Sequence, residues 1–424
     1  MKYELNDKPG LLPMLMYGLQ WWIVSLPCVV IMGIIVSKLH YTDVAEQTFY
    51  LQKLFGIMGV AMVVQVLWGH RLPLVIGPAS VLLIGILATV SAGISAIYTG
   101  ILVGGLVLTV LAYSGWLGKL QFIFTPRVVT VILILIAFTL TPVILNLVMG
   151  DTAHGLFNLF FTLLIVFALV IGNKFLRGIW KSTTVLWGIA GGALVYYLVN
   201  GFPMLPSTGA ESQVSLFNFS LDFEAGTIFS FLFCYVALIV NELGSIQAVG
   251  YMLQADNLNK RTTRGVGVVG LTNVLSGLFG VIGPVDYSMS PGVIAATGCA
   301  SRYTLIPAGI GLIACAFFPA VVGLLVTLPG VVMGAILLYL MATQLAAGMQ
   351  MLVRERAITD FDSGVVVGLP LMVALLLSFA PSEVVNLIPS LFRPIVGNGF
   401  VMGVVSVLIL EHLIFRKSKP VQGA

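Results

Sequence analysis

Two acidic side chains lie inside long apolar segments of this sequence. Glu242 lies in the run FLFCYVALIVNELGSIQAVGYML, and Asp286 lies in the run VIGPVDYSMSPG. A charged side chain at the centre of a membrane costs about 2.5 to 3.5 kcal/mol on insertion scales, so each one needs a reason. Either carboxyl can take up a coupling proton, because burial favours its neutral form, or it can bind donor groups of a polar substrate. Alternatively, it holds the core together through backbone amides and hydroxyls.

Other polar residues accompany these acids. Asn241 and Ser245 are four positions apart and share a helical face, whereas Glu242 points about 100° away. Small polar residues of this kind bind a substrate or join helices to one another. Gln20, in YGLQWWIVSLP, precedes Trp21 and Trp22, which are typical of the membrane interface.

The sequence has no motif typical of an enzyme. Ser-His-Asp patterns, HExxH, a Walker loop and CxxC are all absent, so we expect no hydrolase, zinc or ATP chemistry, no cofactor and no metal. If the protein moves a solute across a membrane, it must therefore draw on an existing ion gradient, of H⁺ or Na⁺. The four cysteines lie within apolar runs and are interpreted as small buried hydrophobic residues.

These residues must be positioned by membrane-spanning helices. Of the 424 residues, 59% are apolar and only 8% charged, a composition that a water-soluble surface cannot tolerate. About 20 apolar residues cross a membrane as a helix. The sequence predicts an all-α, multi-pass membrane protein with fourteen spans, near 16–37, 52–69, 73–90, 93–114, 125–148, 155–172, 183–200, 226–250, 266–282, 286–301, 304–325, 329–349, 363–380 and 395–415.

The basic residues predict the orientation. With both ends in the cytoplasm, all but Lys38, Lys53 and Arg393 of the 20 lysines and arginines fall on the inside, and the loop 201–226 has none. The net charge of +4 therefore reflects topology in a bilayer rather than a nucleic-acid partner. We interpret His70 and Arg71 as orientation signals. The first span has no convincing cleavage site and is expected to stay.

The two halves of the chain contain similar segments around a Gly-Pro pair. LVIGPASVLLIG covers 74–85 and GVIGPVDYSMSPG covers 280–292, about half the chain apart. Seven spans per half make the second copy inverted, as in many secondary transporters. Pro and Gly break a helix, and unwound backbone survives in a membrane only against protein or a water-filled cavity. We therefore predict a substrate site where the breaks around Gly77-Pro78 and Gly283-Pro284 meet, at the amino ends of half-helices.

These motifs resemble those of the nucleobase/ascorbate transporter family, which includes uracil and xanthine permeases. The family signature of the tenth span aligns with 289–298, where Gly292, Thr297 and Gly298 match and the first two positions are Met289 and Ser290. In the eighth span, aligned on Gly244, the family's substrate-binding Glu falls on Asn241 and its proton-linked Asp or His on Ser245. Gln20-Trp21 keeps half of the family's Gln-His pair, and 328–352 and 386–403 are similar to its twelfth span and to the run into its last.

The resemblance implies a fold and a function. It implies a core domain in 1–114 and 201–325, a gate domain in 115–200 and 326–415, a cytoplasmic tail in 416–424, short strands at the breaks in spans 3 and 10, and a homodimer through the gate domains. It implies proton- or sodium-coupled uptake of a nucleobase or similar heterocycle across the inner membrane. Glu242 and Asp286 are the candidates for the coupling proton. The expected substrate-binding residues are Gln20, Ala79, Ser80, Asn241, Glu242, Ser245, Asp286, Ser288, Met289, Ser290 and Gly292.

Two other functions stay open. A transporter of small anions with the same fold would suit half-helix amino ends, although the two acids would repel an anion unless protonated, and no cation lies near the breaks. In an uncoupled facilitator or channel, the acids would be structural.

Overall fold

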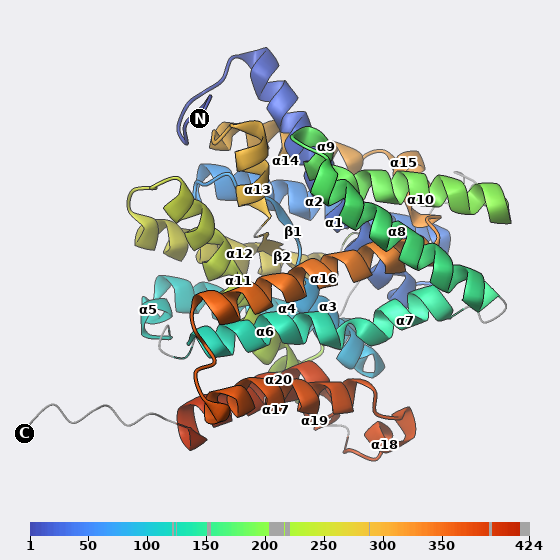
Figure 1. The fold of residues 1–424 in the computed structure, drawn as a ribbon, viewed down its shortest axis with the longest axis vertical. Coiled ribbons are helices and arrows are strands. Elements are labelled where there is room, and N and C mark those ends of the chain that lie inside the picture. Colours follow the sequence, from blue (N-terminus) through green and yellow to red (C-terminus); the bar gives the residue numbers. More distant parts are fainter. Residues whose placement is uncertain are drawn as a thin grey trace, which may run out of the picture.

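The computed structural model describes residues 1–120, 123, 125–150, 154–202, 216, 221–287, 289–389 and 392–415. This part of the chain is mostly helical, with two short strands near the middle of the molecule (Figure 1). Its elements are, in chain order, α1 Leu11–His40, α2 Val44–Leu67, β1 Ile76–Pro78, α3 Ser80–Ala88, η1 Val90–Ala92, α4 Ile94–Tyr113, α5 Trp116–Leu120, α6 Pro126–Thr139, α7 Thr141–Met149, α8 Gly155–Phe175, α9 Ile179–Ser182, α10 Thr184–Asn200, α11 Ala225–Met252, α12 Leu258–Phe279, β2 Pro284–Asp286, α13 Ser290–Thr297, η4 Arg302–Thr304, α14 Leu305–Cys315, α15 Pro319–Val326, α16 Gly330–Arg354, α17 Phe361–Ser378, α18 Ser382–Asn386, α19 Arg393–Val396, α20 Gly399–Ile409 and η5 Leu410–Ile414.

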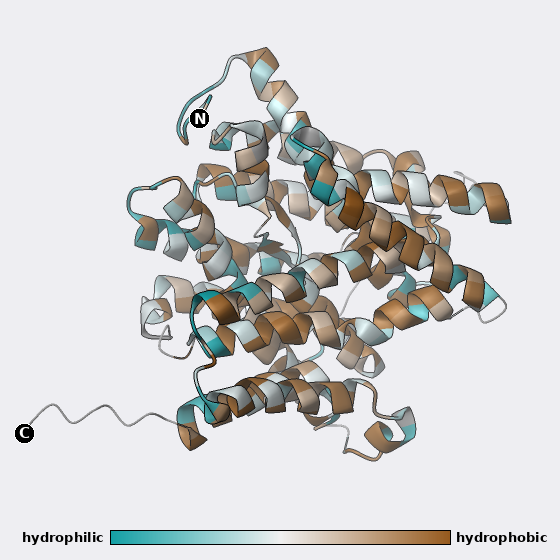
Figure 2. Ribbon diagram, in the orientation of Figure 1, coloured by the Kyte–Doolittle hydropathy of each residue, from teal (hydrophilic) through white to brown (hydrophobic). Residues whose placement is uncertain are grey.

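Most of the long helices are rich in apolar residues (Figure 2). Among the described residues, eight helices are long and apolar enough to cross a membrane, or nine if the pair 302–315 and 319–326, bent by 84°, is one span. Several other predicted spans coincide with shorter elements: α3 and α13 each follow a strand, and α10 and α20 are short apolar helices. The multi-pass helical class is confirmed, and the number fourteen and its inverted halves stay predictions.

Proline accounts for two breaks between helices. Pro142 lies in the first turn of α7, just after α6 ends, and Pro319 begins α15 after α14 ends. Proline lacks an amide hydrogen and is tolerated at the start of a helix but not in its interior. Pro319 therefore starts a helix bent by 84° from the segment before it, whereas α6 and α7 together form one apolar span over Pro126–Met149.

The helices form their main contacts within two groups. One group joins α1, α2, α3, α4, α11, α12 and α14, and the other joins α6, α7, α8, α10, α16, α17 and α20. In the first group, α4 and α12 approach so closely that only glycine fits at two positions. A β-carbon on Gly105 would lie 2.7 Å from the Val274 amide nitrogen, and a β-carbon on Gly270 would lie 2.7 Å from the Thr109 amide nitrogen. Small residues at helix interfaces allow such contact in membrane proteins.

The two strands pair with each other in the first group. β1 and β2 run antiparallel, with Ile76 opposite Asp286, Gly77 opposite Val285 and Pro78 opposite Pro284. α1 and α2 pack against β1, and α11 and α12 pack against β2. The two Gly-Pro breaks therefore meet as predicted, and short strands occur at both.

Candidate functional site

The backbones of the two breaks are joined beyond the strands themselves. The Ala79 amide donates to the Gly283 carbonyl at 2.9 Å, and the Tyr287 amide donates to the Val75 carbonyl at 2.8 Å. The Tyr287 hydroxyl donates to the Pro78 carbonyl at 2.7 Å. These bonds satisfy backbone groups that no helix satisfies, as a lipid environment requires. They also bring the amino ends of α3 and α13 to one place.

Glycine is needed at both breaks because other side chains lie against the backbone. A β-carbon on Gly77 would lie 2.5 Å from the Tyr287 ring, and one on Gly283 would overlap the Asn273 side-chain oxygen. Asn273 itself donates to the Pro284 carbonyl at 3.0 Å and accepts from the Tyr235 hydroxyl at 2.9 Å. Close side-chain packing, and not only flexibility, therefore explains the glycines.

Asp286, at the end of β2, is held by three residues of α11. Its amide donates to Glu242 Oε2 at 3.0 Å, and its carbonyl accepts from Ser245 Oγ at 3.0 Å and from Asn241 Nδ2 at 3.5 Å. Asn241 and Ser245 share a face of α11, as their spacing predicts. Glu242 points elsewhere on the helix but still reaches the same residue, because the end of β2 lies against α11.

His70 completes this cluster from the segment between α2 and β1. The ring is fully buried, and its Nδ1 accepts from the Leu72 amide at 2.9 Å, so we assign the proton of the neutral ring to Nε2. Nε2 lies 3.1 Å from Asp286 Oδ2. The two atoms form a close polar contact, although their geometry is not that of a hydrogen bond. The His70 amide donates to Gln65 Oε1, and Arg261 Nη1 donates to the His70 carbonyl at 3.2 Å.

The charges in this cluster are poorly compensated. Glu242 and Asp286 are fully buried, and Glu242 Oε1 and Asp286 Oδ1 have no hydrogen-bond partner among the residues described. The nearby Arg261 guanidinium binds the carbonyls of His70 and Arg71 and the carboxylate of Asp256. An uncompensated buried charge costs several kcal/mol. Uptake of a proton by one carboxyl would relieve this cost, so the cluster is suited to proton exchange.

A cavity of about 330 Å³ lies beside this cluster, and we call it the central cavity. One wall comes from the breaks, where α3 begins without a side-chain cap and leaves amide groups open toward a ligand. The opposite wall comes from α6 and α16. The lining residues are Cys28, Ile31, Met32, Ala79, Ser80, Val81, Ile136, Asn241, Val285, Tyr287, Met289, Leu340, Met341, Thr343, Gln344 and Ala347.

The structure brings some of the predicted residues together at this cavity. Ala79, Ser80, Asn241 and Met289 line it. The side chains of Glu242, Ser245, Asp286 and Ser290 do not line it, and all four are fully buried.

Ser290 has an internal role, because its hydroxyl accepts from the Val75 amide at 2.9 Å and donates to the Tyr287 carbonyl. Gln20 lies in α1 and does not line the cavity, and its Oε1 is buried with no partner among the residues described. Gly292 is exposed on α13 and also lies outside the lining. Ser288 falls outside the described residues.

Sequence reasoning missed two parts of the site. His70, interpreted as an orientation signal, is instead buried against Asp286, more than 200 residues away in sequence. Its only sequence signal is a histidine at the end of an apolar run, two residues before Leu72. Thr343 and Gln344 of α16 were missed because the predicted site considered only the breaks and the first and eighth spans.

Comparisons with known proteins agree with this architecture. Residues 13–383 match the xanthine/uracil permease model, described as the Permease family. The chain is 24% identical to the xanthine permease of Bacillus subtilis, over 96% of this chain and 95% of that protein. It is 26% identical to a putative purine permease of Clostridium perfringens, over 76% of this chain and 72% of that protein.

The fold also has a solved counterpart. The transmembrane domain of a cyanobacterium bicarbonate transporter superposes with a TM-score of 0.58 at 18% identity, covering 96% of this chain and 98% of that domain. At this identity the likeness concerns the fold alone.

The match over most of the chain, together with the apolar helices, shows that the protein is a transmembrane permease and not an enzyme. It belongs to the Permease family of xanthine and uracil permeases, the nucleobase/ascorbate transporters that its motifs resemble.

Proposed function

We propose that this chain is a secondary active transporter that takes up a nucleobase, or a similar small heterocycle, across the inner membrane by alternating access. The observation that carries the proposal is the central cavity, which is walled by both breaks and has the Glu242, Asp286 and His70 cluster directly behind that wall. Relatives named as xanthine, purine and uric acid permeases support this substrate class.

The cavity lining suits a flat polar ring. Ile31, Val81 and Met341 provide apolar surface for ring faces, while Asn241 and Gln344 carry amide groups on different helices. Each amide offers both a donor and an acceptor, which matches the adjacent N–H and C=O groups at the edge of an oxopurine or pyrimidine. A pocket of a few hundred Å³ with a few convergent polar groups is typical of small-molecule sites.

The buried cluster supplies a path for coupling. The carbonyl of Asp286 accepts from Asn241, which lines the cavity, while the carboxyl of Asp286 faces His70 and its amide donates to Glu242. Protonation of Glu242 or Asp286 would change the charge behind the cavity wall that contacts the substrate. It would also change the hydrogen bonds and electrostatic contacts that hold the end of β2. We therefore propose H⁺ as the coupling ion, with Na⁺ as the alternative, and Glu242 and Asp286 as the residues that carry the proton.

Alternating access would use the two helix groups. The central cavity lies between the breaks, in the group of α1, α3 and α11, and helices α6 and α16 of the other group. Movement between a core domain of 1–114 and 201–325 and a gate domain of 115–200 and 326–415 would open it to either side in turn. We propose a homodimer through the gate domains and cytoplasmic termini.

A binding screen with the purified full-length protein tests the substrate class. Thermal unfolding is measured with xanthine, uric acid, hypoxanthine, adenine, uracil, bicarbonate and sulfate. A ligand that binds only the folded state raises the unfolding temperature by mass action. We expect at least one heterocycle to raise the unfolding temperature and bicarbonate and sulfate to have no effect. Stabilisation by bicarbonate or sulfate and by no heterocycle would contradict the proposal.

Two other functions remain candidates. A small-anion transporter is favoured by the shared fold of the bicarbonate transporter domain and by the half-helix amino ends, but two buried acids face the same region. An uncoupled facilitator would use the same cavity, and Glu242, Asp286 and His70 would only stabilise the fold. Uptake that persists unchanged after the proton and sodium gradients are dissipated would favour the facilitator.

A further inference from the structure

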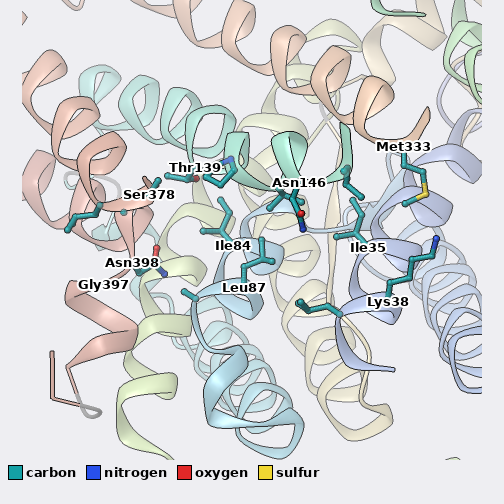
Figure 3. Close-up of a pocket in the computed structure, with 17 residues that line it drawn as sticks. Ile35, Lys38, Ile84, Leu87, Thr139, Asn146, Met333, Ser378, Gly397 and Asn398 are labelled. Atoms are coloured by element: carbon teal, nitrogen blue, oxygen red, sulfur yellow. The ribbon is translucent and has the colours of Figure 1, made fainter. Parts of the chain in front are cut away.

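A second cavity, of about 460 Å³, lies at the far end of α1 from the amino terminus (Figure 3). We call it the Lys38 cavity, because Lys38 is the one charged residue among the described residues that line it. The view shows the amide of Asn146 between Ile84 and Leu87 on one side and Ile35 and Lys38 on the other. The cavity thus lies between α1 and α3 of one helix group and α7 of the other.

The Lys38 cavity continues the direction of the central cavity. On α1 the lining moves from Met32 of the central cavity to Ile35, and on α3 it moves from Val81 to Ile84. Residues three or four apart lie one above the other on a helix, about 5.4 Å along its axis. The same step occurs on α6, where Ile136 lines the central cavity and position 139 lines the other. About one helical turn therefore separates the two cavities.

The layer between the cavities is apolar. Ile35, Ile84, Ile136 and Met333 belong to it, and their side chains are 7%, 5%, 2% and 1% exposed. Ile35 and Ile84 belong to one helix group, and Ile136 and Met333 belong to the other. Only apolar side-chain packing holds these four residues together. A small relative shift of the groups would open this layer, so it has the composition and position of a gate.

Some polar side chains of the Lys38 cavity already form hydrogen bonds within the protein, and others do not. The Asn398 side chain caps α20 by accepting from the amides of Phe400 and Val401, and the Thr139 hydroxyl donates within its own helix. The Lys38 ammonium and the Asn146 amide have no hydrogen bond or ion pair with any described residue. These two side chains come from opposite walls and are free to bind a ligand.

We propose that the Lys38 cavity is a second substrate site, where a planar heterocycle with a negative charge or several carbonyl oxygens binds before it passes the apolar layer to the central cavity. The inference rests on the proposed function and on the orientation that the basic residues predict, which places this end outside. Ring faces would contact Ile35, Ile84 and Leu87. The Lys38 ammonium would bind the anionic or carbonyl edge, and the Asn146 amide an adjacent ring N–H or carbonyl.

Uptake kinetics in intact cells that express the full chain test the role of Lys38. The probes are radiolabelled urate, an anion at neutral pH, and radiolabelled hypoxanthine, which is uncharged. We expect Lys38→Gln to raise KM for urate about tenfold and KM for hypoxanthine much less, because only urate loses an ion pair with the ammonium. Lys38→Arg keeps the charge and should keep KM for urate within about twofold.

The matched control is Lys53→Gln. Lys53 is another lysine predicted on the outside, but it packs over the Phe49 ring and lines neither cavity. Its replacement should leave the urate-to-hypoxanthine ratio of KM values unchanged. If the wild type takes up urate with the same KM as Lys38→Gln, the second site is wrong and the proposed function stands. If the wild type takes up neither probe, the second site is wrong, while the binding screen with the other heterocycles decides the proposed function.

A second variant tests the cavity independently of charge. Ala88→Trp fills the Lys38 cavity, whereas Ala92→Trp on η1 lies outside its lining. We expect Ala88→Trp to lower uptake at least tenfold while the purified variant still binds xanthine at the central cavity with the wild-type Kd, which shows that it has folded. Uptake at the wild-type rate in Ala88→Trp would overturn the inference.

Discussion

Asp286 links the wall of the central cavity to Glu242 and His70 through both its backbone and its side chain. Its carbonyl accepts from Asn241 and Ser245, its amide donates to Glu242, and its carboxyl contacts His70. A change of protonation at either acid therefore acts on the strand that ends beside the central cavity. This arrangement gives each residue of the cluster a testable role.

The acids should determine how uptake depends on pH. A carboxyl that must load a proton makes uptake fall as the external pH rises, and an amide cannot load one. We expect Glu242→Gln and Asp286→Asn each to flatten the pH profile of initial uptake rates and to lower the maximal rate. The control is Asp362→Asn on the exposed surface of α17. Wild-type pH profiles in both Glu242→Gln and Asp286→Asn would remove these residues from the coupling site.

His70 should position Asp286 as well as influence the pH profile. His70→Leu leaves the buried Leu72 amide without its acceptor, which costs about 1 to 3 kcal/mol, and it removes the close polar contact to the Asp286 carboxyl. We expect a lower unfolding temperature and slow uptake in this variant. His70→Asn, which keeps a donor and an acceptor, should recover part of both. Equal stability in wild type and His70→Leu would show that the contact does not matter.

At the scale of elements, the two breaks could be predicted from the sequence but their details could not. Gly-Pro pairs about half the chain apart predicted where the helices stop and that the breaks face each other. The pairing of Ile76 with Asp286 depends on tertiary packing against α11 and α12, which no local pattern encodes. His70 escaped prediction for the same reason, since only the fold brings it to Asp286.

The packing at the first break predicts a stability difference between two glycine substitutions. Gly77→Ala places a methyl group 2.5 Å from the Tyr287 ring, and overpacking of this kind costs about 1 to 3 kcal/mol. The matched control is Gly368→Ala in α17, where a β-carbon meets nothing within 4 Å and helix propensity improves. Thermal unfolding of the purified variants should show a loss only for Gly77→Ala. Equal unfolding temperatures would mean that the break is not tightly packed.

At the scale of the whole molecule, composition and charge predict the environment better than they predict the spans. A chain with 59% apolar residues is correctly assigned to the membrane. The count of spans is harder, because segments such as β1 with α3, or the bent pair 302–315 and 319–326, are not continuous long helices. Among the residues that the structure describes, apolar length alone therefore finds eight or nine helices, where the hydropathy pattern predicts fourteen spans.

The predicted orientation can be tested with single cysteines introduced on opposite sides. Lys8 is exposed near the amino terminus, and Phe223 is 64% exposed just before α11. A membrane-impermeant maleimide should label Phe223→Cys in intact cells and Lys8→Cys only after the membrane is opened. The wild type serves as control, since its described cysteines are buried or half-buried. Labelling of both positions from one side would contradict the topology.

We propose that the central cavity, between the breaks and α16, holds the substrate, and two neighbouring alanines of α16 allow a direct test. Ala346 and Ala347 are both exposed, but only Ala347 lines the central cavity. The measurement is equilibrium binding of radiolabelled xanthine to purified wild type, Ala346→Trp and Ala347→Trp. We expect the same Kd for wild type and Ala346→Trp and no detectable binding to Ala347→Trp. Xanthine binding to Ala347→Trp with the wild-type Kd would contradict a substrate site in the central cavity.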